Sequence, residues 1–173
     1  MVSVWVGYLL VFKGADKIGS YFFQTELFFL CLFQTIFLAR ISTMTQKDFH
    51  GWHQKKSSIH NLETRPFFHE KEIWFSYLGT NIGFEQDGVG GDFQRPVVII
   101  RKFNNEVCWI IPLSKTDKRG KYYFAFPFNK NITSVAILSQ IRLLDAKRLS
   151  RKIGEMEDKD FVKLIEKLKI LLL

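Results

Sequence analysis

Two arginines and a serine stand at the ends of predicted strands, where their side chains could reach a phosphate together. Arg95 opens the strand predicted for residues 96–103, and its planar guanidinium could clamp a phosphate through two parallel hydrogen bonds. Ser114 ends the strand predicted for residues 106–114 and offers a hydroxyl group. Arg142 follows a later strand and brings a second guanidinium. Each of these residues alone is more often a surface charge or a turn residue, so their meaning depends on their order and their neighbours.

A glycine-rich insert at residues 87–92 separates two predicted strands. Glu85 and Gln86 precede this insert, and Arg95 closes it together with Pro96. Its glycines lack the Gly-Lys-Ser/Thr ending of nucleotide-binding loops, and no helix follows them. The insert is therefore interpreted as a flexible loop between strands, where binding segments often lie.

Strand patterns dominate the chain after residue 67. Runs of β-branched and aromatic residues predict strands at residues 72–78, 96–103, 106–114, 122–128, 133–138 and 149–153. A helix is predicted before them at residues 45–61, and an amphipathic helix after them from Asp158, with apolar residues at helical spacing. Several short strands followed by one packing helix predict a mainly β domain, a small partly closed barrel with a C-terminal helix.

Composition allows a globular protein with acidic partners. Hydrophobic residues make up 47% of the 173 residues and charged residues 24%, which is ordinary for a soluble domain. The net charge of +8 favours either nucleic acid or an acidic protein segment as a partner, and does not choose between them.

The sequence gives little support for a metal site or for disulfide bonds. His50 and His53 are three residues apart, as on one helix face, but no cysteine or glutamate completes a zinc-like spacing, so a solvated face is favoured over a metal site. Cys31 and Cys108 form no disulfide framework and are interpreted as thiols in a reducing compartment. We expect neither a metal nor a cofactor.

The first 43 residues do not match the rest. Their apolar run at residues 27–39 includes Gln34 and is shorter than the ~20 residues that a spanning helix needs. We interpret residues 1–43 as a hydrophobic extension upstream of the true start at Met44, followed by a helix and linker at 44–69 and the strand-rich domain at 70–173. The alternative is a genuine hydrophobic anchor or signal-anchor.

The strand-rich part resembles the PemK/MazF family of toxins from bacterial type II toxin–antitoxin pairs. Six pieces stand in the family's order: Glu72-Ile-Trp-Phe, Gly83-Phe-Glu-Gln86, Arg95-Pro-Val-Val-Ile-Ile100, Pro112-Leu-Ser114, Ser134-Val to Ser139-Gln-Ile-Arg-Leu-Leu-Asp145, and Arg148-Leu to Arg151-Lys-Ile-Gly154. The resemblance covers roughly residues 70–172. It implies an SH3-like barrel of the CcdB/PemK/MazF kind, usually a homodimer, that acts in the cytoplasm.

The same resemblance implies a metal-independent endoribonuclease, an mRNA interferase that cleaves single-stranded RNA through the ribose 2′-hydroxyl. It also implies a cognate antitoxin, which we expect to bind through an acidic, partly disordered segment. The alternative is a non-catalytic module of the same fold, one that binds RNA or DNA or poisons another enzyme by contact.

Residue roles follow from the same motifs. Arg95 is implied to stabilise the phosphate and take part in proton transfer, and Ser114, where the family usually has threonine, to hydrogen-bond the scissile phosphate. Glu85 is implied as the acid–base residue. RNA binding is implied for Gln86, Gln140 and Arg142. Ser139 departs from the family, because many members have aspartate before the Gln-Ile-Arg sequence, and the loop between Gln86 and Arg95 is longer than in short members.

Overall fold

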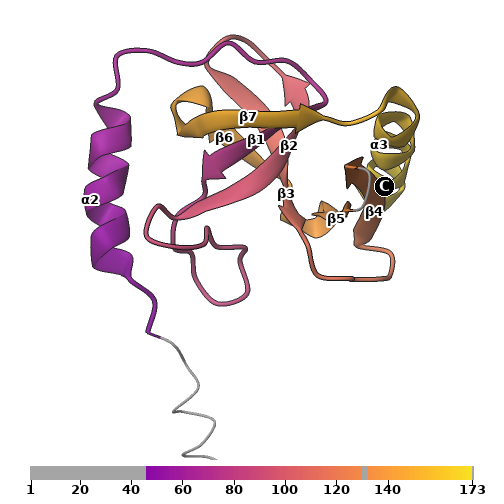
Figure 1. Ribbon diagram of the computed structural model, residues 1–173, viewed down its shortest axis with the longest axis horizontal. Helices are drawn as coiled ribbons and strands as arrows, with labels where there is room; N and C mark the ends of the chain where they lie inside the picture. Colours follow the sequence, from indigo (N-terminus) through magenta and orange to yellow (C-terminus); the bar gives the residue numbers. More distant parts are fainter. Residues whose placement is uncertain (1–45, 130–131, 173) are drawn as a thin grey trace, which may run out of the picture. The chain divides into compact units, whose positions relative to one another are not determined.

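The computed structural model describes residues 46–129 and 132–172 (Figure 1). A compact unit begins at Lys47 and contains every helix and strand described below. The predicted hydrophobic extension at residues 1–43 and the predicted start at Met44 lie outside the described residues. Within the described part of the chain, no helix is long and apolar enough to cross a membrane.

Seven strands and two α-helices make up this unit, together with two short 3₁₀ turns at Leu138–Gln140 and Ala146–Arg148. In chain order the elements are α2 (Phe49–His60), β1 (Glu72–Tyr77), β2 (Gln94–Lys102), β3 (Val107–Ser114), β4 (Tyr123–Asn129), β5 (Ile132–Ile137), β6 (Arg142–Asp145), β7 (Leu149–Glu155) and α3 (Asp158–Leu172). The predicted mainly β class with a C-terminal helix is confirmed.

The strands form one antiparallel sheet in the order β4-β5-β3-β2-β1-β7 (Figure 1). Strand β3 is the branch point: its first half pairs with β6 through Val107 and Asp145, and its end pairs with β5 through Leu113 and Ala136. Among the described strands no pairing joins β4 to β7, so the sheet is not closed. The antiparallel pairing of β2 with β3, in which Val97 lies opposite Pro112, brings the end of β3 next to the start of β2, where the candidate residues lie.

Both faces of β2 are buried in the middle of the strand. Along β2, Val98 and Ile100 belong to one apolar cluster and Val97 and Ile99 to the other, as the two-residue alternation of a strand requires. Helix α3 covers the first cluster through Leu164 and Leu168, among other residues. A strand that is apolar on both faces has a continuous run of hydrophobic residues, and such a run predicts β2 from the sequence.

Two details differ from the sequence prediction. Helix α2 begins at Phe49 rather than at 45, because Asp48 is its N-cap and accepts a hydrogen bond from Gly51 N at 2.8 Å. Strand β6 was not predicted. It has four residues, lacks β-branched side chains and stands between two 3₁₀ turns, so its extended form depends on pairing with β3.

Candidate active site

Arg95 is fixed between the β1–β2 loop (residues 78–93) and the end of β3. Its Nε donates to the backbone oxygen of Asp87, and its Nη1 donates to the backbone oxygen of Leu113 at 3.3 Å. The side chain is half-buried, and this burial lowers the pKa of Arg95, partly opposed by the nearby Asp87 carboxylate. A guanidinium has five N–H groups. The two contacts therefore orient it and leave N–H groups, including both on Nη2, for an anion.

A pocket of about 770 Å³ opens beside this guanidinium. Its polar lining includes Asp92, which pairs with Lys55 at 3.2 Å, and Gln94, Arg95, Ser114, Lys115, Thr116 and Ser134. Apolar residues such as Ile73 and Leu113 line other parts of it. Two cationic side chains and several hydroxyl groups in one concave site suit a phosphate or another anion.

Ser114 presents its hydroxyl at the end of β3. Its backbone pairs with Val135 of β5, and its Oγ accepts a hydrogen bond from Thr116 N at 3.2 Å. That contact orients the oxygen and leaves the hydroxyl hydrogen available to a bound group. The structure thus brings Arg95 and Ser114, 19 positions apart in the sequence, to one pocket.

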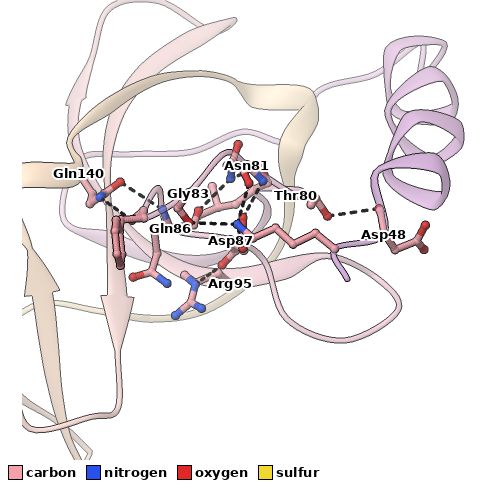
Figure 2. A network of polar contacts seen from close by, with 11 residues as sticks. Asp48, Thr80, Asn81, Gly83, Gln86, Asp87, Arg95 and Gln140 are labelled. Atoms are coloured by element: carbon pink, nitrogen blue, oxygen red, sulfur yellow. Dashed lines mark hydrogen bonds and ion pairs between the residues drawn. The ribbon is translucent and has the colours of Figure 1, made fainter. Parts of the chain in front are cut away.

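Gln140 holds the β1–β2 loop in place. Its Oε1 accepts a hydrogen bond from Gln86 N at 3.2 Å, and its Nε2 donates to Phe84 O at 3.3 Å (Figure 2). Asn81 Nδ2 donates to Gln86 O at 3.0 Å from within the loop. The sequence predicts Gln140 as an RNA contact, but in the structure its amide is engaged by the protein backbone.

Glu85 and Arg142 do not line the pocket. Glu85 is exposed on the loop, where its backbone N–H donates to Ile82 O at 3.1 Å. Arg142 begins β6 opposite Ile110, close enough to Arg148 that its charge adds to burial in lowering the pKa of Arg148. Of the predicted site residues, only Arg95 and Ser114 line the pocket. Gln86 and Gln140 are linked to Arg95 through the loop, as Figure 2 shows, but lie outside the pocket, as do Glu85 and Arg142.

Sequence reasoning missed Asp87, Lys115 and Thr116. The sequence predicts only a flexible loop at Asp87, yet its backbone carbonyl anchors Arg95. It assigns no role to Lys115 and Thr116, although both line the pocket beside Ser114. The available signal was the polar run that follows directly on the apolar end of β3. Within residues 46–129 and 132–172, no group of three or more histidine, cysteine, aspartate or glutamate side chains is arranged to hold a metal ion.

The comparisons with known proteins agree with this fold. Residues 70–172 match the family described as PemK-like, MazF-like toxin of type II toxin–antitoxin system. The chain therefore belongs to this toxin family, and the resemblance of its motifs is confirmed. Helix α2 and the linker after it precede the matched segment. No curated protein matches the chain.

Solved structures of similar fold include three bacterial toxins. MazF from Deinococcus radiodurans is 19% identical with a TM-score of 0.50, over 64% of this chain and 98% of that one. Mycobacterium tuberculosis toxin MazF-mt6 is 17% identical with a TM-score of 0.46, over 58% and 95%. An endoribonuclease from a mycobacterial species, in complex with its cognate antitoxin, is 15% identical with a TM-score of 0.46, over 62% and 94%. At 19% identity, the likeness to the Deinococcus protein concerns the fold alone.

Proposed function

We propose that this toxin cleaves single-stranded RNA without a metal ion, using the ribose 2′-hydroxyl as the nucleophile. The observation that carries the proposal is the Arg95 guanidinium, fixed by two backbone carbonyls on the wall of a pocket that also holds the Ser114 hydroxyl. A preorganised cation of this kind stabilises charge that develops on a phosphate, which is often the largest single contribution to catalysis.

The proposed reaction is an internal transfer at phosphorus. The 2′-oxygen forms a bond to phosphorus while the bond from phosphorus to the 5′-oxygen breaks, so the products are a 2′,3′-cyclic phosphate and a 5′-hydroxyl. One proton leaves the 2′-oxygen and one reaches the departing 5′-oxygen, and each assisted transfer typically contributes ~10²–10⁴-fold. Arg95 neutralises the growing charge on the non-bridging oxygens, and Ser114 donates a hydrogen bond to them.

Glu85 remains the proposed acid–base residue. Its side chain is exposed and does not line the pocket, but it lies on the same loop as Asp87, which holds Arg95, so bound RNA that reaches past Arg95 would meet it. Ser139 is exposed in the 3₁₀ turn after β5 and has no carboxylate, so it supplies no base in place of the family's aspartate. Gln86, Gln140 and Arg142 remain proposed RNA contacts. None of them lines the pocket, so they would bind RNA outside it, Gln140 through the amide hydrogen that it does not donate to Phe84 O.

The proposed partners follow from charge. A net charge of +8 suits RNA, and it also suits an antitoxin with an acidic segment that folds onto the same surface. We propose that the toxin acts in the cytoplasm as a homodimer, like other members of its family, and that such an antitoxin blocks the pocket.

The test is RNA cleavage by the full chain, free of antitoxin, in excess EDTA. We expect discrete fragments of a long single-stranded RNA, with 2′,3′-cyclic phosphate and 5′-hydroxyl ends. A matched RNA with 2′-deoxyribose at the mapped site should bind and remain intact there, because it lacks the nucleophile. Cleavage of the deoxy substrate, or cleavage abolished by EDTA and restored by a divalent metal, would refute the mechanism.

One result would favour the alternative function. If folded toxin leaves RNA intact under all these conditions and still binds it, the chain is a non-catalytic module of the same fold. The replacement of the family's aspartate by Ser139 is the observation that favours this alternative.

The hydroxyl of Ser114 is expected to stabilise the transition state by donating a hydrogen bond to the charged phosphate oxygens. Ser114→Ala should lower kcat by about 10–100-fold, since a hydrogen bond to a charged group contributes about 1.5–3 kcal/mol. Ser114→Thr keeps the hydroxyl and should retain most of the activity. Single-turnover cleavage rates would measure both variants, and an unchanged rate for Ser114→Ala would remove this residue from the site.

A further inference from the structure

Helix α2 lies outside the family-matched segment, yet it packs against the loop that holds Arg95. Trp52 is only 6% exposed, its ring lies 5.7 Å from that of Phe93, and it packs directly over Gly79. Gly79 has a φ of +84°, and a Cβ there would lie 2.0 Å from the Trp52 ring. The helix therefore contacts both ends of the β1–β2 loop, and only glycine permits the close approach.

Lys47, just before α2, joins three points of that loop. Its Nζ lies 2.8 Å from Asp87 Oδ2 and donates to Asn81 O at 2.7 Å and to Gly83 O at 3.2 Å. The side chains of Lys47 and Asp87 are each 30% exposed. Asp87 Oδ1 in turn accepts a hydrogen bond from Asn81 N. One ammonium group thus ties together three residues of the loop, Asn81, Gly83 and Asp87, which lie close to one another in Figure 2.

Asp87 links this closure to the candidate active site. Its side chain faces Lys47 and Asn81, while its backbone oxygen accepts the hydrogen bond from Arg95 Nε. Without Lys47, only the Asn81 N–H would hold the Asp87 carboxylate, which could then turn towards the Arg95 guanidinium and compete with a phosphate for it. Lys47 therefore has two effects: it fixes the carbonyl that orients Arg95, and it keeps the neighbouring carboxylate occupied.

We propose that Lys47 is a positioning residue for catalysis, which acts through Asp87 to set the orientation and availability of Arg95. This inference rests on the proposed ribonuclease function and deepens it. It gives the segment before the toxin domain a role in the reaction, because α2 and Lys47 contact the long β1–β2 loop and hold it in place.

The test compares two variants that each lose one positive charge. Lys47→Ala removes the contacts to the loop, whereas Lys56→Ala removes an exposed lysine of α2 for which the described residues offer no hydrogen bond or ion pair. In the full chain, Lys47→Ala should lower kcat for RNA cleavage by about 10–100-fold with little change in KM, as expected for a misplaced catalytic group. Lys56→Ala should keep the wild-type kcat, and Lys47→Arg should restore most of it.

Two further measurements separate positioning from charge. Hydrogen exchange at the amides of Asn81 and Gly88, which are bonded within the loop, should be faster in Lys47→Ala than in Lys56→Ala. In an Asp87→Asn background, Lys47→Ala should cause little further loss of kcat, because the two residues act as a unit.

The outcomes are distinct. An active wild type with unchanged kcat in Lys47→Ala, or equal losses in Lys47→Ala and Lys56→Ala, would overturn the positioning role alone. Fully additive losses in the double variant would overturn its route through Asp87. A wild type that does not cleave RNA would overturn the proposed function itself.

Discussion

Replacing Arg95 with alanine is expected to slow RNA cleavage by about 10²–10³-fold, the usual effect of removing one preorganised donor from a developing anion. The loss should fall on kcat, because the guanidinium acts mainly on charge that appears in the transition state. Arg95→Lys should recover little activity. A lysine is a point charge without a planar fork, so it cannot keep the contacts to Asp87 and Leu113 and also grip a phosphate.

The measurement is single-turnover cleavage in EDTA, with thermal unfolding of each variant. Arg95→Ala leaves two backbone carbonyls without their donor, which costs about 1–3 kcal/mol, so assays should be run well below the unfolding midpoint. Arg101→Ala is the matched control. Arg101 lies at the other end of β2, is 64% exposed and pairs only at 3.6 Å with Glu70. Cleavage by Arg95→Ala within a few-fold of the Arg101→Ala rate would mean that the pocket is not the catalytic site.

The second large effect concerns stability and its dependence on pH. Glu72 begins β1 and is only 5% exposed. Burial by itself would raise the pKa of Glu72, but hydrogen bonds from Lys152, from the backbone of His69 and from Trp74 outweigh it and lower the pKa to about 2. The donors are close: Lys152 Nζ at 2.6 Å, Trp74 Nε1 at 2.9 Å and His69 N at 3.0 Å.

A carboxylate whose pKa is lower in the folded chain stabilises the fold at high pH. The contribution of Glu72 is complete above its unfolded pKa of about 4.5 and is lost as the pH falls towards about 2. Glu72→Gln should therefore reduce the free energy of unfolding at neutral pH by about 3 kcal/mol. The difference between wild type and variant should shrink between pH 4.5 and 2.

Denaturant titrations across that pH range would measure this. Glu155→Gln is the control, since Glu155 approaches the same Lys152 at 3.7 Å but is 51% exposed, and exposed pairs contribute little. If Glu72→Gln and Glu155→Gln lose the same stability at neutral pH, the buried network around Glu72 is not a stabilising element.

Several parts of this protein follow from the sequence alone. The runs around β2 and β3 predict buried strands, because apolar side chains on successive positions must face two cores. The apolar spacing of Leu164 and Leu168 predicts the packing face of α3. The six motifs in order identify the family, and they place Arg95 and Ser114 at strand ends. These are local patterns, or patterns whose order along the chain is enough.

Other parts depend on the tertiary structure. The sequence does not show that Gln140 binds the backbone of Phe84 and Gln86, 56 and 54 positions away, or that Lys47 reaches Asp87. The pattern of apolar residues in the sequence predicts which side chains turn inward, but it does not predict which distant backbone atoms a polar side chain will contact. Such contacts depend on the register of paired strands and on the course of a long loop. The register and the course of the loop are decided only when the sheet assembles. The sequence by itself therefore determined the family and the residues at the strand ends. The tertiary structure decided how Arg95 is held.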